Sequence, residues 1–308
     1  MDPRQVDLCG VSLACTEGEA WYVPVLSPEP GSHLDRDSAL ALIGPLLEDE
    51  GILKVAQNLK FDMNIMRQAG VAVQGPCFDT MIASFITDSS RSSHGMDALA
   101  SSLLDIQCIP LSSLLGRGKK RRTFDTLALD DATIYAAEDA DITWRLYERL
   151  KVDLQEGDLQ VLFDQLEMPL VPVLADMEWS GIRVDPGELD RQQGKLSDRA
   201  ESLRAAAIDA SPHSFNPDSP KQLAAVLFNE PGAEPPGLGL SPMKRGKTGP
   251  STDQEVLEKL DADPDIDTPI PGILLEYRQL AKLVGTYLVS LKEAISPVTG
   301  RVHTSFHQ

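Results

Sequence analysis

Three features that would each define a class of protein are missing from this sequence. Basic residues are too few for a uniformly basic nucleic-acid coat protein, because 28 Lys and Arg stand against 47 Asp and Glu and give a formal net charge of −19. No apolar run approaches the roughly 18 residues of a membrane helix, and residues 1–5 carry neither the basic stretch nor the hydrophobic core of a signal peptide. We therefore expect a cytoplasmic protein with no membrane partner.

Cysteine is scarce and follows no ligand pattern. Cys9, Cys15, Cys77 and Cys108 form no C-x-x-C pair and lie in apolar surroundings, which argues against a zinc site and a disulfide framework. We interpret all four as reduced thiols. The acidity of the chain still permits nucleic-acid binding, because local basic patches, or carboxylates that hold metal ions against phosphates, act within an acidic protein.

The composition, 42% hydrophobic and 24% charged, is that of a globular protein, and the length favours two domains of about 100 to 200 residues each. The first part alternates strands and helices, which indicates an α/β layer with at least one parallel strand pair. Its expected elements are a β-hairpin of residues 6–14 and 21–25, a strand at 52–56, and helices at 37–50, 58–69, 79–87, 97–104 and 130–154.

Strand signals vanish beyond Gly157, so we place a domain boundary within residues 151–160. The rest of the chain reads as helices whose starts are marked by N-cap residues and by proline. The expected features of this part are helix starts at Asp185-Pro186 and Ser219-Pro220, a Gly/Pro-rich loop at 229–250, a capping box at Thr252-Asp253-Gln254-Glu255, a helix at 270–295 and a strand at 301–308.

Two spacings in the first part could support chemistry. Asn58 and Asp62 are four residues apart, as are Tyr135 and Asp139, so the members of each pair share one helix face. Two helices that each present a carboxylate to a common cleft can hold divalent cations, because Mg²⁺ prefers oxygen ligands and usually takes one or two carboxylates together with substrate phosphates. Each spacing alone also occurs by chance on a solvated helix.

Together with their flanks, these segments resemble the family A DNA polymerases, the family of bacterial DNA polymerase I. KVAQNLKFD is similar to the second exonuclease motif of that family, FDTMIASFI to the helix that follows it, and IYAAEDADIT to the third exonuclease motif of the tyrosine-bearing DEDD type. The later segments resemble the connection to the thumb, the thumb itself and the entry to the palm. They are MEWSGIRVD, SFNPDSPKQLAAVLF, GPSTDQEVLEKL, LLEYRQLAKLVGTYL and GRVHTSFHQ, in the order of the family.

The resemblance implies an α/β ribonuclease H-like exonuclease domain, with a mixed sheet and helices, over residues 1–155. Mainly α-helical connecting helices and the polymerase thumb would occupy residues 156–296, and the start of an α+β palm would occupy 297–308. The implied function is template-directed DNA synthesis with a 3′-5′ proofreading exonuclease, in DNA replication and repair. The implied cofactor is Mg²⁺ or Mn²⁺ in a two-metal site. The implied enzyme is a monomer of the bacterial cytosol, associated with the nucleoid.

The resemblance also assigns roles to residues of this sequence. Asp139 would be a direct metal ligand, Asp62 would serve the second metal site, and Tyr135 would orient the attacking water. Asn58 and Phe61 would support the site, although the family usually has tyrosine at the position of Phe61.

The first exonuclease motif of the family, an Asp-x-Glu, would lie upstream of Met1, and no such motif precedes Val6. Two of the four metal carboxylates are therefore not in this sequence, so we expect little exonuclease activity from this chain alone. The polymerase carboxylates would lie beyond Gln308. We therefore expect an internal piece of a polymerase.

The expected partner is DNA, bound both as a single-stranded 3′ end and as a primer-template duplex. Phosphate contacts of this kind do not depend on base sequence and are sensitive to salt. The resemblance assigns duplex binding to Arg278, Lys282, Thr286 and Tyr287, and to Lys244, Arg245, Lys247, Ser251 and Thr252 at the thumb tip. For Arg117, Lys119, Lys120, Arg121 and Arg122 two interpretations stay open: attraction of a DNA backbone near the exonuclease cleft, or a flexible surface loop.

Two other functions compete with this interpretation. A stand-alone exonuclease similar to ribonuclease D can also contain Y-A-A-x-D, but it has no counterpart of SFNPDSPKQLAAVLF or RQLAKLVGTYL. A non-catalytic DNA-binding scaffold would keep the exonuclease fold only as structure, and the intact Asp62, Tyr135 and Asp139 argue against it for the parent protein.

Overall fold

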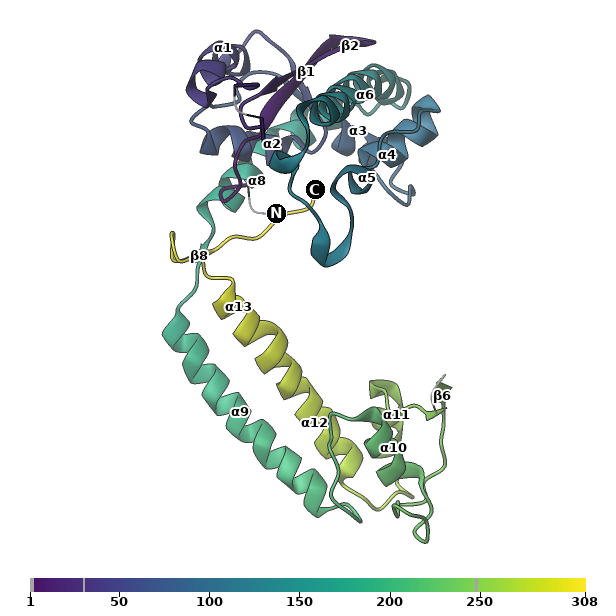
Figure 1. The fold of residues 1–308 in the computed structure, drawn as a ribbon. Coiled ribbons are helices and arrows are strands. Elements are labelled where there is room, and N and C mark those ends of the chain that lie inside the picture. The colour runs from purple at the N-terminus through teal and green to yellow at the C-terminus, as the bar shows by residue number, and fades with distance from the viewer. Residues whose placement is uncertain (1–2, 30, 247–248) are drawn as a thin grey trace. The chain divides into compact units, whose positions relative to one another are not determined.

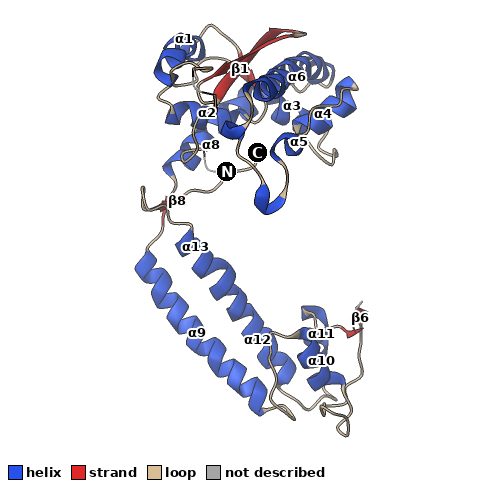
Figure 2. Cartoon of the chain, viewed as in Figure 1, coloured by secondary structure: helices blue, strands red, loops and turns tan. Residues whose placement is uncertain are grey.

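The computed structural model describes residues 3–29, 31–246 and 249–308. The chain divides into two compact units, of which unit 1 comprises Met1–Gly181 with Thr304–Gln308 and unit 2 comprises Ile182–His303. Figure 1 shows the course of the chain, and Figure 2 shows that helices dominate both units.

Unit 1 contains two strand pairs surrounded by helices, as expected for an α/β domain. Its strands are β1 (Gly10–Thr16), β2 (Glu19–Pro24), β3 (Lys54–Ala56) and β4 (Cys77–Asp79). Its helices are α1 (Arg36–Glu48), α2 (Leu59–Gln68), α3 (Thr80–Thr87), α4 (Met96–Leu99), α5 (Leu111–Leu115), α6 (Leu129–Glu156), α7 (Gln160–Leu162) and α8 (Met168–Ser180). Tighter or wider helical turns lie at η1 (Ala100–Leu104), η2 (Gly118–Lys120), η3 (Phe124–Thr126) and η4 (Phe163–Glu167).

The predicted β-hairpin is confirmed as the antiparallel pair β1–β2, in which Val11 lies opposite Val23. The turn between the strands contains Gly18 at φ +81°, a backbone conformation that favours glycine. The Gly18 N–H donates to Asp141 Oδ1 of α6 at 2.7 Å. This bond ties the hairpin to α6, which packs along both strands (Figure 1).

The predicted parallel pairing is confirmed between β3 and β4, where Ala56 lies opposite Asp79. The sequence interpretation missed β4 and began a helix at Asp79. Only three residues form this strand, too few for an alternating pattern to be recognised. In the described residues of unit 1 the strands form two separate pairs, one antiparallel and one parallel, in place of one mixed sheet.

The largest core of unit 1 lies between β4, α3 and the long helix α6. The Phe78 ring contacts Tyr147 edge-on at 4.9 Å and Phe163 at 4.6 Å, measured between ring centroids. Leu146, Leu150 and Leu154 of α6 are completely buried beside them. Because these leucines recur every four residues, the helix predicted at 130–154 is fixed by one apolar stripe, and it forms as α6.

Contacts within the chain place the boundary between the two compact units at Gly181. The reason is that α8 packs against α2 of the same unit. Lys60 of α2 forms an ion pair of 2.8 Å with Glu178 of α8, and both side chains are largely buried. The end of the chain joins this contact, since the Phe306 N–H donates to Glu178 Oε1 at 2.6 Å and the Lys60 ammonium donates to the Phe306 carbonyl.

Unit 2 is mainly helical, as predicted. Its helices are α9 (Pro186–Asp209), α10 (Pro220–Phe228), α11 (Gln254–Asp261), α12 (Ile270–Lys282), the wider turn η5 (Leu283–Val289) and α13 (Ser290–Glu293). Its strands are β5 (Ile182–Arg183), β6 (Arg245–Gly246), β7 (Gly249–Pro250) and β8 (Arg301–Val302). The helix predicted at 270–295 is therefore continued through η5, and the strand predicted at 301–308 is limited to β8, which pairs with β5.

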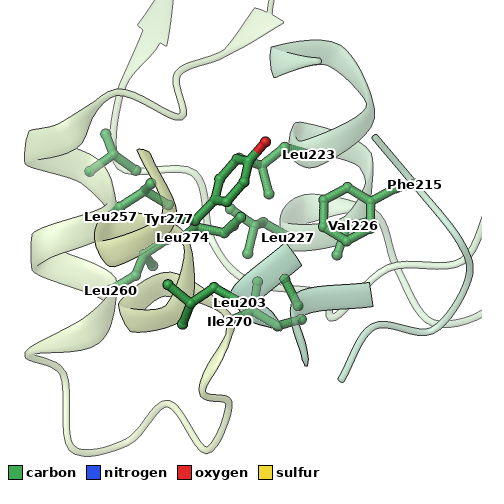
Figure 3. Close-up of a cluster of buried hydrophobic side chains, with 12 residues drawn as sticks. Leu203, Phe215, Leu223, Val226, Leu227, Leu257, Leu260, Ile270, Leu274 and Tyr277 are labelled. Atoms are coloured by element: carbon green, nitrogen blue, oxygen red, sulfur yellow. The ribbon is translucent and has the colours of Figure 1, made fainter. Parts of the chain in front are cut away.

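The core of unit 2 joins α9, α10, α11 and α12. Figure 3 shows Leu223 and Leu227 of α10 grouped with Leu257 of α11 and Leu274 of α12. The Tyr277 hydroxyl at the edge of this core donates to Asp218, with its oxygen 2.9 Å from Oδ1. Apolar side chains from four helices thus enclose one core and hold the helix ends in place.

Helix capping in unit 2 confirms two predicted starts and corrects a third. The Asp185 side chain accepts the N–H of Gly187 and Glu188, and the Ser219 side chain accepts that of Gln222. The predicted capping box was one residue early, because Asp253, not Thr252, accepts the Val256 N–H at 3.0 Å. Among the described residues, no helix has the length and apolar character needed to cross a membrane.

Candidate functional site

The start of α2 positions the first predicted pair of site residues. Asn58 adopts a left-handed conformation at φ +66° and makes no side-chain capping bond, and its side chain is exposed. Its backbone N–H donates to Asp79 Oδ1 at 3.2 Å, and the Leu59 N–H donates to Asp79 Oδ2 at 2.7 Å. The backbone therefore starts α2 at a fixed point while the Asn58 amide stays on the surface.

Asp79 also starts the next helix. Its Oδ1 accepts the Met81 N–H at 2.8 Å and the Ile82 N–H at 3.4 Å, so one carboxylate caps both α2 and α3. Burial raises its pKa, and the backbone hydrogen bonds oppose that rise. The sequence interpretation did not assign this residue a role. An aspartate directly before a helical pattern is the N-cap signal that could have found it.

Asp62 lies on the first turn of α2. The residue as a whole is exposed, but protein groups surround its carboxyl group closely. The pKa of Asp62 is raised from its ordinary range to about 7. Loss of hydration is the larger cause and the charge of Asp79 is the smaller one. Phe61 beside it is half-buried. Asp62 is thus a carboxylate close enough to Asp79 for the charge of one to raise the pKa of the other.

The second predicted pair lies in the middle of α6. The Tyr135 hydroxyl lies near the Asp139 carboxylate, as the spacing of four residues allows, and the two groups shift each other's pKa. Burial raises the pKa of Asp139 to about 7, the Tyr135 hydroxyl lowers it, and the charges of Glu138 and Asp97 raise it further. The pKa of Tyr135 is also raised, chiefly by burial.

One oxygen of Asp139 is unusual. Its Oδ1 is buried and has no hydrogen-bond partner among the described residues. A buried carboxylate oxygen without a partner carries a large desolvation cost, and native structures rarely leave such an atom unsatisfied unless an ion or a ligand completes it. The backbone carbonyl of Asp139, unlike Oδ1, has a side-chain partner, since the Thr143 hydroxyl donates to it at 2.7 Å.

Two further carboxylates lie near Asp139. Glu138 is occupied, because its Oε2 accepts the Ile109 N–H at 2.7 Å. Asp97, on the first turn of α4, is exposed. The sequence interpretation used Asp97 only as a helix start, because nothing in its spacing connects it to residue 139. The structure therefore adds Asp97 to the neighbourhood of the Tyr135–Asp139 pair.

The oxygen atoms available as metal ligands fit part of a magnesium site. Carboxylate oxygens are the ligands that Mg²⁺ and Mn²⁺ prefer, and Asp139 Oδ1 is such an oxygen without a hydrogen-bond partner in the described residues. Among the described residues, no three acidic, histidine or cysteine side chains gather closely enough to hold a metal. Neither Asp62 nor Asp139 is a cause of the pKa shift of the other, so the structure does not pair them directly.

Two of the predicted duplex-binding residues have internal partners. Arg278 is half-buried and donates from Nη1 to the Thr252 carbonyl at 2.5 Å, and loss of hydration lowers its pKa. The side chain of Thr252 is buried, with 6% of the residue exposed. Their bond ties α12 to the segment that precedes α11.

The predicted thumb-tip residues differ in how far they are engaged. The Lys244 ammonium lies 2.7 Å from Asp253 Oδ2 and 3.4 Å from Glu255 Oε2, and the bond to Asp253 is the main cause of its raised pKa. The Ser251 hydroxyl accepts the Asp253 N–H at 3.2 Å. Arg245 is exposed on β6, and Lys247 lies outside the described residues. The other predicted residues, Lys282, Thr286 and Tyr287, are exposed on α12 and η5.

The sequence matches two family models. Residues 1–155 match the 3′-5′ exonuclease family, and residues 187–308 match DNA polymerase family A. DNA polymerase I of Pseudomonas aeruginosa is 41% identical to this chain over 315 residues, and DNA polymerase I of Rhizobium leguminosarum is 37% identical over 326 residues. These alignments cover 100% and 99% of this chain but 33% and 31% of those proteins, so the chain spans about a third of their length.

A solved structure shares the fold. It is the POL domain of Pol1 from M. smegmatis, in a complex with DNA primer-template and dNTP. The match has a TM-score of 0.75 and 25% sequence identity, and it covers 98% of this chain and 46% of that chain.

The fold and the matches define a 3′-5′ exonuclease domain followed by a polymerase segment. This chain belongs to DNA polymerase family A, together with the DNA polymerase I proteins. The predicted family and fold class are thereby confirmed. The match of residues 187–308 also excludes the stand-alone ribonuclease D-like alternative, which has no such segment.

Proposed function

We propose that this chain is part of a DNA polymerase I, an enzyme of template-directed DNA synthesis, and that unit 1 contributes to its 3′-5′ proofreading exonuclease. The observation that carries the proposal is the buried Asp139 Oδ1, which has no hydrogen-bond partner among the described residues, on the helix face that also carries Tyr135. A carboxylate needed only for structure would have both oxygens satisfied, as Asp79 does. The family match supports the same role.

The residues of unit 1 take the following roles. Asp139 and Asp62 would hold Mg²⁺ or Mn²⁺, which prefer carboxylate oxygens. Such a cation would lower the pKa of a bound water and stabilise developing charge on the leaving oxygen. The Tyr135 hydroxyl, next to the Asp139 carboxylate, would orient the attacking water. Asn58 and Phe61 shape the surface beside Asp62.

Unit 2 binds DNA as a primer-template duplex, and unit 1 binds a single-stranded 3′ end. The exposed side chains of Lys282 and Arg245 are the cations best placed for phosphate contacts, because neither forms an ion pair within the described ranges 3–29, 31–246 and 249–308. Arg278 and Lys244 contribute less, since their charges already have partners. Support comes from the likeness to Pol1 of M. smegmatis, whose structure contains DNA. The parent enzyme is a monomer of the bacterial cytoplasm.

Degradation of a 5′-labelled single-stranded DNA with Mg²⁺ or Mn²⁺ tests the exonuclease proposal. The comparison includes this chain, the chain extended by an upstream strand with the Asp-x-Glu motif, and Asp139→Asn in both. Glu148→Gln is the matched control, because Glu148 is an exposed carboxylate of the same helix.

We expect shortening of the 3′ end by the extended chain and by its Glu148→Gln variant, and none by its Asp139→Asn variant. Equal cleavage by the extended chain with and without Asp139→Asn would contradict the assignment. The absence of cleavage by every form would instead favour the non-catalytic DNA-binding scaffold.

A further inference from the structure

The segment Arg117–Arg122, named here the basic loop, contains five cationic residues among six in a chain whose net charge is −19. It links α5 to α6, includes the short turn η2, and is exposed throughout. In Figure 1 the segment between α5 and α6 extends away from the helices of unit 1. Five like charges within six residues repel one another, so an arrangement of this kind is favoured when an anion is bound to it.

The positive charges of the basic loop are not neutralised by carboxylates of the described residues. Other arginines of unit 1 lie in ion pairs, such as Arg67 with Asp176 and Arg145 with Asp141. In the part of the chain that the structure describes, no carboxylate forms an ion pair with any of the five loop cations, although acidic residues outnumber basic ones. The net charge of −19 already favours solubility, so solubility does not explain five cations within six residues.

The ends of the loop are fixed, so its charges stay at one position. The Arg122 N–H donates to the Leu115 carbonyl at 2.9 Å, and Arg122 Nη2 donates to the Leu114 carbonyl at 2.7 Å. Arg117 Nη2 donates to Ser112 Oγ at 3.3 Å. Leu115 is buried in a small apolar cluster with Leu127. These bonds close the loop and leave Lys119, Lys120 and Arg121 at its tip.

The same cluster connects the loop to the exonuclease site. Phe124, two residues beyond Arg122, packs against that cluster, and its ring centroid lies 6.0 Å from that of Tyr135. Tyr135 in turn lies next to Asp139, whose pKa the charges of Glu138 and Asp97 also raise. These carboxylates repel phosphates, so a DNA strand can approach them only if cations close by offset the repulsion.

We propose that the basic loop binds the phosphodiester backbone of single-stranded DNA whose 3′ end enters the Tyr135–Asp139 site. This inference rests on the proposed exonuclease function and names where its substrate strand is held. Single-stranded DNA is the fitting occupant because the loop lies beside a site for a free 3′ end and presents lysine and arginine side chains without base-reading geometry. Binding of this kind is independent of sequence and releases counterions.

The test is fluorescence anisotropy with a labelled oligothymidylate in EDTA, at about 50 to 200 mM salt, where binding is measured without cleavage. The loop variant is Lys119→Gln with Lys120→Gln, because the structure gives neither side chain a protein partner. The control is Arg36→Gln with Lys151→Gln, which removes the same charge from other helices of unit 1.

We expect the loop variant to reduce the slope of log affinity against log salt by about 1.4, or about 0.7 for each lost phosphate contact, and to weaken binding on the order of tenfold at low salt. The control should keep the slope of the unchanged chain. An unchanged slope in the loop variant, an equal loss in the control, or no binding by the unchanged chain would each overturn the proposal. Because EDTA removes the metal, failure of the exonuclease proposal would show in the cleavage assay and not here.

Discussion

Two buried or partly buried aspartates of unit 1, Asp79 and Asp139, differ in how their oxygens are satisfied. Asp79 receives four backbone N–H groups from the starts of α2 and α3. Asp139 lies near the Tyr135 hydroxyl, and its Oδ1 is buried without a hydrogen-bond partner in the described residues. The comparison teaches that hydrogen-bond satisfaction separates a carboxylate that builds the fold from one that is available to a ligand.

The largest expected effect is on stability, through Asp79. Asp79→Ala removes the cap of two helices and leaves buried N–H groups unsatisfied, so we expect a loss of about 3 kcal/mol in the free energy of unfolding of unit 1. Urea denaturation and hydrogen exchange of α2 and α3 measure it. The control Asp35→Ala, which removes the single cap of α1, should cost about 1 kcal/mol. Equal losses in the two variants would show that Asp79 acts as an ordinary cap.

Unit 2 offers the same comparison between Arg278, which has a hydrogen-bond partner, and the exposed Lys282. Arg278→Ala breaks the bond to the Thr252 carbonyl and should cost about 2 kcal/mol of stability, whereas Lys282→Ala should cost less than about 0.5 kcal/mol. On a primer-template duplex, Lys282→Ala should reduce the salt slope by about 0.9. A larger loss of stability in Lys282→Ala than in Arg278→Ala, together with an unchanged salt slope in Lys282→Ala, would contradict this distinction.

The pH dependence of stability sharpens the comparison further. Burial raises the Asp139 pKa to about 7 in the folded chain, against about 4 in an unfolded chain. Between these values the folded state binds more protons, so this group lowers stability as the pH rises. Asp139→Asn should therefore be more stable than the unchanged chain at about pH 8, by on the order of 1 kcal/mol.

Thermal denaturation across the pH range would show this difference, which should shrink as the pH falls below 7 and vanish near about pH 4. Glu148→Gln should show no such trend. A difference that grows toward low pH would mean that the carboxylate is stabilised by the fold.

Much of this site could be predicted from short-range pattern. The spacing of Tyr135 and Asp139 predicted their shared helix face, and in the structure the two side chains are close enough for each to shift the pKa of the other. Asn58 lies at the predicted helix start. The helix predicted at 130–154 agrees closely with α6, whose leucines form one apolar stripe. These relations involve residues within about two turns of one another, where periodicity carries the information.

The remaining features depend on contacts between distant residues. Asp79 caps α2 from 20 residues away, and Asp97 lies near Asp139 only because α4 contacts α6. The packing of α8 against α2, which includes the ion pair of Lys60 with Glu178, brings residues more than 100 positions apart together. No local pattern encodes such pairings. The one-residue error at Asp253 has a different origin, since Thr252 and Asp253 are both good N-caps and burial of Thr252 decided between them.

The most direct test of the account is Mn²⁺ binding to the whole chain, measured by electron paramagnetic resonance. The account predicts that Asp139→Asn weakens binding by roughly tenfold or more, because the unsatisfied Oδ1 is a ligand, while Asp79→Asn and Glu148→Gln leave the affinity of the folded protein within about twofold. Equal Mn²⁺ affinity in the unchanged chain and in Asp139→Asn would contradict it, and would make the buried oxygen of Asp139 a structural feature without a metal-binding role.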